Sequence, residues 1–181
     1  MTRRIFLYPE VRTLAGVDHC DECGFVYASV EPHELAGQLA AVGVRYAAAL
    51  EQVPELRRRP APSVWSALEY TCHVRDVLRV QKKRLALALQ VDNPEFPPMG
   101  RDELAVANAY NDQDPAVVLV DLADAASRLA LAFAVLQPEQ WNRTGMYNWP
   151  TRERRTMLWL GRHTLHEVEH HLLDISRSAR P

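Results

Sequence analysis

Hydrophobic residues recur at helical spacing through most of this chain, and no stretch alternates in the way that a half-buried strand requires. Four long stretches show the helical pattern, at about residues 32–53, 63–90 and 114–136 and from about residue 156 onward. Ser63, Asp114-Pro115 and Thr156 supply plausible helix starts. Long helices with one apolar face are typical of helix bundles. The sequence therefore predicts an all-α protein, a four-helix bundle preceded by a short irregular N-terminal extension.

Composition narrows the class of protein. The chain has 181 residues, of which 48% are hydrophobic, which suits one domain with a proper core. The formal net charge of -2 does not favour a nucleic-acid partner. No apolar stretch approaches the roughly 20 residues that a membrane helix needs. Three cysteines, an odd number, do not form a disulfide framework. We therefore expect a soluble, cytoplasmic protein that binds neither nucleic acid nor membrane.

Histidines are concentrated near the end of the chain. Four of the seven lie between His163 and His171. Within this segment, two pairs of ligand-type residues are spaced four apart, His166 with His170 and Glu167 with His171. Side chains four apart on a helix point the same way, so either pair could give two ligands to one metal ion.

The phase of the helix separates these two pairs. At about 100° per residue, one continuous apolar stripe is formed by Leu158, Gly161, Leu165, Val168, Leu172 and Ile175. His171 and Glu167 lie about 60° and 100° from Val168, at the edge of this stripe. His166 and His170 lie about 160° away from Val168, so we expect these two side chains to face solvent. The phase thus favours Glu167 and His171 as the inward pair.

An earlier histidine also points inward. His73 recurs in phase with Tyr70, Val74, Val77, Val80 and Leu87, whereas Arg75, Arg79 and Lys82 are expected on the opposite side. A single inward histidine is usually a hydrogen-bonded core residue. Together with Glu167 and His171, however, it would make a three-ligand site with one open position, which is the arrangement of catalytic zinc.

Residues 1–30 differ in character from residues 31–179, the expected bundle. They contain Cys20-Asp-Glu-Cys23-Gly24, which has the form of half a zinc knuckle. A structural zinc needs two more ligands, and no second cysteine pair exists; His33 or His19 could contribute, but adjacent His19 and Cys20 cannot easily reach one ion. A redox pair and an ordinary reduced turn are the alternatives, and we favour the turn.

Two further expectations concern the cysteines. Because Cys20 and Cys23 lack evident partner ligands, we expect their segment to be dispensable for the site in the bundle. Cys72 falls away from the inward stripe of its helix, and we expect it to be inert.

Two sequence patterns resemble a known family. The first is Trp65-Ser-Ala-Leu-Glu-Tyr-Thr-Cys-His73-Val-Arg-Asp76, and the second is His163-x-x-His166-Glu167-x-x-His170-His171-Leu-Leu-Asp174-Ile175. Together they are similar to the DinB/YfiT-like superfamily, and the resemblance covers most of residues 31–178. It implies a four-helix bundle, often a homodimer, that binds a divalent metal through one histidine of the second helix and two residues four apart on the last.

The last predicted helix resembles one branch of this family more specifically. Aligned on His171-x-x-Asp174, the chain is similar to the branch of mycothiol-dependent maleylpyruvate isomerase, whose N-terminal domain carries Glu-x-x-x-His at this place. It therefore implies His73, Glu167 and His171 as ligands of zinc or nickel. Asp76 and Asp174, each about one helical turn beyond a ligand, are candidates for residues that orient the imidazoles, although each is equally well explained as a charge on the helix surface.

The resemblance also implies thiol chemistry. Enzymes of this kind activate a low-molecular-weight thiol such as mycothiol or bacillithiol for attack on an electrophile, since a bound metal lowers the thiol pKa. We therefore expect a metal-dependent thiol S-transferase, or a related isomerase-like enzyme, with small-molecule partners. Two alternatives stay open: a metallohydrolase that activates water, and a non-catalytic metal-binding stress or interaction protein.

Overall fold

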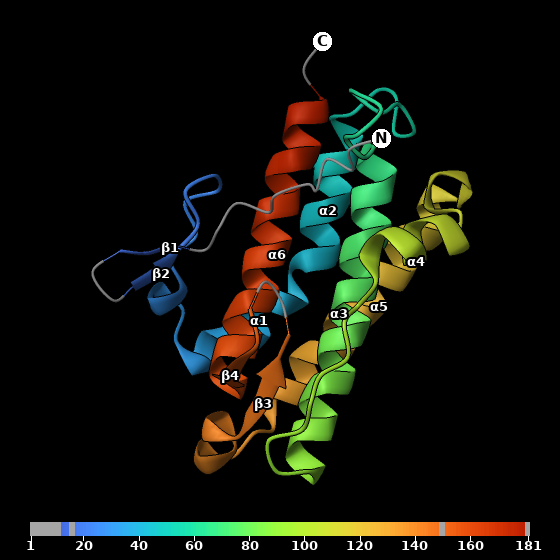
Figure 1. Ribbon diagram of the computed structural model, residues 1–181. Helices are drawn as coiled ribbons and strands as arrows, with labels where there is room; N and C mark the ends of the chain where they lie inside the picture. Colours follow the sequence, from blue (N-terminus) through green and yellow to red (C-terminus); the bar gives the residue numbers. More distant parts are fainter. Residues whose placement is uncertain (1–11, 15–16, 149–150, 180–181) are drawn as a thin grey trace.

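The computed structural model describes residues 12–14, 17–148 and 151–179 of the chain. Its long helices form a bundle (Figure 1), so the prediction of an all-α four-helix bundle is confirmed. The bundle is built from α1 Pro32–Ala40, α2 Val42–Glu51, α3 Ala67–Gln90, α5 Pro115–Ala134 and α6 Met157–Ser178. Helix α3 packs against α5 and α6, and the α1–α2 pair contacts the same two helices from the other side. No helix in the described part of the chain has the length and apolar character needed to cross a membrane.

Local capping signals set most of the helix boundaries. The Asp114 and Thr156 side chains accept hydrogen bonds from backbone N–H groups in the first turns of α5 and α6, as expected from the sequence. The expected cap of α3 at Ser63 is wrong by three residues. Ser66 caps this helix instead, in a capping box where Ser66 Oγ accepts from the Glu69 N–H and Glu69 accepts from the Ser66 N–H.

The first predicted helix is divided in two. α1 and α2 meet at Ala41, yet one apolar face runs through both and reaches the core with Leu35, Leu39, Val42 and Tyr46. Just after the break, α2 approaches α5 closely. A Cβ atom at Gly43 would lie 2.7 Å from the Ala123 Cβ, so the absence of a side chain permits this contact.

Shorter elements surround the bundle. Between α3 and α5 lie α4 Arg101–Ala107 and the 3-10 turn η2 Tyr110–Asp112, and two other 3-10 turns are η1 Tyr27–Ser29 and η3 Pro138–Asn142. Two antiparallel hairpins, which we did not predict, are formed by β1 Arg12–Leu14 with β2 Val17–His19 and by β3 Thr144–Tyr147 with β4 Glu153–Thr156. Strands of three or four residues are too short to show an alternating pattern.

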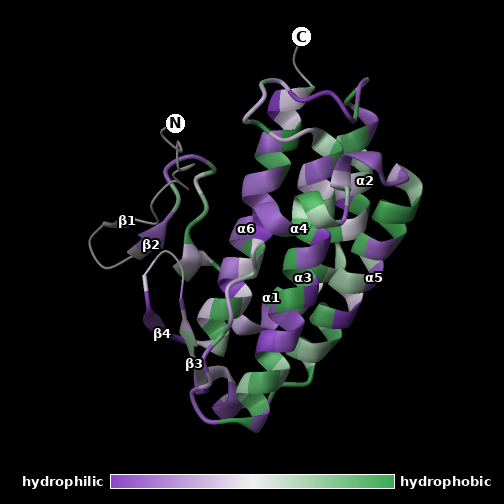
Figure 2. Ribbon diagram, turned by 45° about the vertical axis from the view of Figure 1, so that its right-hand side comes forward, coloured by the Kyte–Doolittle hydropathy of each residue, from purple (hydrophilic) through white to green (hydrophobic). Residues whose placement is uncertain are grey.

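The segment that contains β1, β2 and η1 lies along α6 on the side away from α3 (Figure 1). In Figure 2 much of α6 is coloured purple, at the hydrophilic end of the scale, although this helix is central in the molecule. The backbone and side chains of the N-terminal segment attach to α6 at several points: Tyr27 Oη lies 2.8 Å from His163 Nδ1, and Arg162 donates to the Val30 carbonyl. The polar face of α6 is therefore covered, which decides the environment of its histidines.

Candidate metal centre

Three ligand-type side chains converge between α3 and α6. His73 Nε2 lies 3.9 Å from Glu167 Oε2, and His171 Nε2 lies 3.8 Å from the same oxygen. All three residues are buried, and one ligand atom of each lies within 4.8 Å of the others. Helical phase predicted that these residues point inward from two separate helices, and in the structure their side chains lie close together.

The donor atoms of this trio lack partners. Both ring nitrogens of His73 and the Nε2 of His171 are buried without a hydrogen-bond partner among the described residues. Buried polar groups are nearly always hydrogen-bonded, and an unpaired one costs about 1–3 kcal/mol. Ligand atoms around a tetrahedral zinc are roughly 3.3 Å apart, and the two distances to Glu167 Oε2, 3.9 and 3.8 Å, exceed that separation by about half an ångström. The trio fits a divalent metal in composition and in arrangement.

The neighbours of the trio fix the orientation of its imidazoles. His171 Nδ1 lies 2.9 Å from Asp174 Oδ2, and because an ionised carboxylate only accepts, the imidazole donates this hydrogen bond. Burial by itself raises the pKa of Asp174, but the hydrogen bond to His171 and the charges of His171, His170 and Arg177 together outweigh it and lower the pKa below the usual range. The Tyr70 ring stacks on His171 at 5.2 Å, and the Trp65 ring lies 5.2 Å from that of His73. The lone pair of His171 Nε2 is thereby directed toward Glu167.

Asp76 does not take the role expected for it. Its carboxylate accepts hydrogen bonds from Arg75, from Tyr110 Oη at 2.6 Å and from Arg79, whereas the His73 nitrogens have no partner among the described residues. Arg75, which the helical pattern placed on the outer side, is itself buried because η2 and the Asp76 carboxylate enclose it. The proposed contact between Asp76 and His73 is therefore wrong, and Asp76 belongs to a separate polar cluster.

Glu167 is surrounded by histidines on both sides. Its Oε2 faces His73 and His171, and its Oε1 lies 3.6 Å from His166 Nδ1 and 3.9 Å from His163 Nε2. Burial by itself raises the pKa of Glu167, but the neighbouring His166 and His73 hold the pKa well below its ordinary value. The carboxylate is therefore ionised and available as a ligand.

The architecture and the site can be compared with known proteins. The family model of the DinB superfamily matches residues 38–175, which include all three members of the trio. The chain belongs to the DinB superfamily. A solved structure, YfiT from Bacillus subtilis, is described as a probable metal-dependent hydrolase with an unusual four-helix bundle topology. It matches this DinB protein with a TM-score of 0.70 and 20% identity, covering 81% of this chain and 86% of that one. No curated protein matches the chain.

His166 and His170 of this DinB protein do not face solvent. They are only 3% and 6% exposed, so the expectation from helical phase is wrong. The phase correctly turned them away from the bundle core, but the N-terminal segment covers the opposite face of α6. Cys20 Sγ lies 3.6 Å from His170 Nδ1, and the Phe25 ring lies 5.8 Å from the His166 ring.

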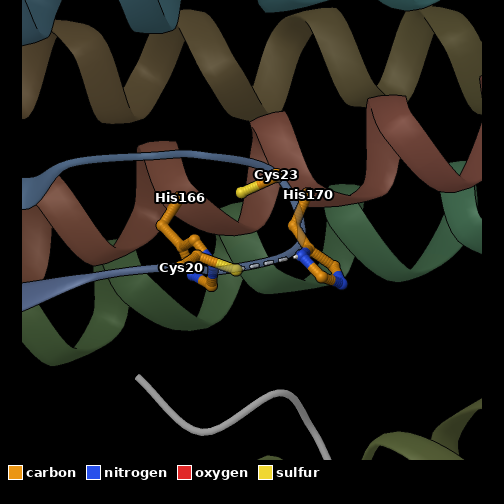
Figure 3. Close-up of side chains that lie close together, drawn as sticks. All are labelled: Cys20, Cys23, His166 and His170. Atoms are coloured by element: carbon orange, nitrogen blue, oxygen red, sulfur yellow. Dashed lines mark hydrogen bonds between the residues drawn. The ribbon is translucent and has the colours of Figure 1, made fainter. Parts of the chain in front are cut away.

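The cysteines of the N-terminal segment have partners after all. Cys20 and Cys23 lie beside His166 and His170 (Figure 3), so the assumption that partner ligands are missing is wrong. Burial by itself raises the pKa of the Cys23 thiol, but the two histidines lower the pKa to about 5. Sequence reasoning missed this cluster because 142 positions separate Cys23 from His166. The signal that could have found it was the unpaired Cys-x-x-Cys itself.

Cys72 is also buried, contrary to the outward position expected from its helix. It packs with Leu68, Ala105 and Tyr110 in a small cluster between α3 and the segment of α4 and η2. Burial raises the pKa of its thiol to about 12. The thiol is therefore protonated at neutral pH and shielded from reagents.

Proposed function

We propose that this DinB protein is a metal-dependent enzyme that holds one divalent ion through His73, Glu167 and His171. The observation that carries this proposal is the convergence of two buried imidazoles on one ionised carboxylate, since the Nε2 atom of each imidazole has no hydrogen-bond partner among the described residues. Two histidines and one glutamate are also the ligand set of several catalytic zinc sites, where a fourth position stays open. A divalent ion held by these residues would act as a Lewis acid and would lower the pKa of a bound water or thiol.

The residues around the trio have separate tasks in this proposal. Asp174 accepts the Nδ1–H of His171 and so presents the Nε2 lone pair as a ligand. The rings of Trp65 and Tyr70 pack against the two imidazoles and limit the access of bulk water. Asp76 is not part of the site and is assigned to stability instead.

Hydrolysis is the first candidate reaction. Imidazole nitrogen and carboxylate oxygen are the donors of catalytic zinc sites, where the metal would lower the pKa of water for attack on a carbonyl or phosphoryl centre. The similarity to YfiT, described as a probable metal-dependent hydrolase, supports the same choice. In this candidate, Glu167 serves as a ligand and the substrate is a small molecule.

Thiol S-transfer is the second candidate and is favoured by a different observation. Glu167-x-x-x-His171-x-x-Asp174 resembles the mycothiol-dependent isomerase branch of the superfamily. In this candidate, the trio would hold zinc or nickel, which would lower the pKa of a low-molecular-weight thiol such as mycothiol or bacillithiol. The thiol sulfur would then bond to a carbon of a small electrophile as a halide or an epoxide oxygen leaves that carbon. We also propose that the protein is located in the cytoplasm and forms a homodimer.

Metal analysis tests the site. Relative to the wild type, His171→Ala and His73→Ala should each lose one equivalent of divalent metal, measured by elemental analysis of protein purified without chelator. The matched control is His33→Ala, because His33 is an exposed histidine in α1. Retention of the full metal content by His171→Ala would overturn the site.

Activity assays then distinguish between the two candidate reactions. The metal-loaded wild type is assayed on simple carboxylic and phosphoric esters, and separately on an alkyl halide or epoxide with a low-molecular-weight thiol. The reaction is identified when its product forms with the wild type and with His33→Ala but does not form with His171→Ala. Ester hydrolysis without thiol supports the first candidate, and thiol consumption supports the second. Metal binding with no turnover in either assay overturns the enzyme proposal in favour of a non-catalytic metal-binding protein.

A further inference from the structure

A second group of metal-type ligands lies on the other face of α6. Cys20 and Cys23 come from the turn that follows β2, and His166 and His170 project toward them from α6 (Figure 3). One ligand atom from each of the four residues lies within 4.8 Å of the others. This group shares no residue with the trio of His73, Glu167 and His171. Cys20 and Cys23 also lie outside residues 38–175, where the family model matches.

The spacing of these residues is that of structural zinc sites. Cys-x-x-Cys followed by His-x-x-x-His falls within the usual ligand spacing of a two-cysteine, two-histidine site. The turn that presents the thiols is already formed, since the Gly24 N–H donates to the Cys20 carbonyl at 2.8 Å. Gly24 has a φ of +72°, a left-handed conformation that glycine adopts without strain.

The distances approach those of a coordinated ion. Zinc–sulfur bonds of about 2.3 Å and zinc–nitrogen bonds of about 2.0–2.1 Å in a tetrahedron place neighbouring ligand atoms roughly 3.3–3.8 Å apart. Cys20 Sγ and His170 Nδ1 are 3.6 Å apart, within that interval. This pair is therefore already at a separation that one ion requires, and the other ligand atoms lie within 4.8 Å of one another.

An independent observation points to a missing ligand. His166 is 3% exposed, and neither of its ring nitrogens has a hydrogen-bond partner among the described residues. An imidazole buried in this way loses its hydrogen bonds to water and gains no hydrogen bond in their place. Coordination of a metal by one ring nitrogen would compensate for part of that loss.

We propose that Cys20, Cys23, His166 and His170 bind a structural zinc ion that fastens the N-terminal segment to α6. Four protein ligands leave no open coordination position, so this zinc is structural rather than catalytic. The site lies next to the candidate catalytic trio, because His166 Nδ1 is 3.6 Å from Glu167 Oε1. The zinc would hold the segment that covers this face of α6 and thereby keep Glu167 shielded from solvent on its Oε1 side.

Metal counting in single-site variants tests the proposal. The wild type should contain two zinc equivalents per chain, and Cys20→Ser with Cys23→Ser should remove one of them. Cys72→Ser is the matched control, since Cys72 is a buried cysteine outside both groups, and it should keep both. His73→Ala should remove the other equivalent, so a failure of the catalytic trio to bind metal leaves this test unaffected.

Cobalt substitution of the wild type tests the same site without a variant that could misfold. Cobalt bound by two thiolates should give a near-ultraviolet charge-transfer band. The band should persist in His73→Ala. Three results would each overturn the proposal. The first is a zinc content that the cysteine substitutions leave unchanged, and the second is the absence of the band in the cobalt-loaded wild type. The third is a Cys20–Cys23 disulfide in protein kept under reducing conditions.

Discussion

Replacement of Asp76 tests the assignment of this residue to stability rather than to the metal centre. In the structure its carboxylate neutralises Arg75, and the side chains of the two residues are only 12% and 6% exposed. Tyr110 Oη and Arg79 donate to the same carboxylate. Asp76→Asn preserves the shape of the side chain and removes its charge. The buried Arg75 guanidinium is then left without its counter-ion.

The expected loss in free energy of unfolding follows from the burial of this ion pair. Removing one partner of a buried ion pair costs about 3–5 kcal/mol. Arg75 still donates to Gln113 Oε1 at 2.7 Å, so we expect the lower end, about 3 kcal/mol. For a chain of this size that corresponds to a fall in Tm of about 6–12 °C. Asp121→Asn is the control, because the Arg79–Asp121 pair is 43% and 42% exposed and should contribute below about 1 kcal/mol.

Urea unfolding of both variants at several pH values measures the effect. Burial alone raises the pKa of Asp76, but Arg75 and Tyr110 lower the pKa below its ordinary value. The stabilisation is therefore fully present above the unfolded-state pKa and is lost as pH falls through the folded-state value. The difference between wild type and Asp76→Asn should be largest near neutral pH and should shrink below about pH 4.

Metal content completes the experiment on Asp76. Asp76→Asn should bind as much metal as the wild type under conditions where both are folded. A variant that loses metal while its free energy of unfolding stays within about 1 kcal/mol of the wild type would refute our reasoning. Asp76 would then act on His73 after all.

Two further substitutions test packing and ligand orientation. Gly43→Ala should destabilise the protein by about 1–3 kcal/mol, measured by urea unfolding, because the new methyl group would lie 2.7 Å from the Ala123 Cβ and 3.1 Å from its Cα; unchanged stability would mean that α2 and α5 can separate freely. Asp174→Ala should weaken metal binding at the trio by about 10–100-fold in a chelator competition, because His171 loses the acceptor of its Nδ1–H; an unchanged affinity would contradict the orienting role.

Helical periodicity was sufficient to predict the architecture and part of the candidate site. The apolar stripe of α6 and the inward phase of His73 both depend on local geometry, about 100° per residue. Two helices whose apolar faces meet must bring the residues at the edges of those faces together. Glu167 and His171 therefore lie beside His73, as their phase indicated.

Contacts made by segments outside the periodic helices could not be predicted in the same way. His166 and His170 are on the outer face of α6 with respect to the bundle, but the segment that covers them comes from the start of the chain. Asp76 follows His73 by one helical turn, and that spacing alone suggested a contact. Tyr110 and Arg75 donate hydrogen bonds to its carboxylate instead, and the helical pattern does not predict the position of Tyr110.

The contact between Cys20 and His170 joins residues 150 positions apart in the sequence. A ribosome adds about 5–20 residues per second, so roughly 8–30 s pass between synthesis of the first of these residues and synthesis of the second. Throughout that interval the nascent N-terminal segment has no α6 to dock on. The thiols of Cys20 and Cys23 therefore depend on the redox state of their surroundings, and not on the fold, until translation of the last helix is complete.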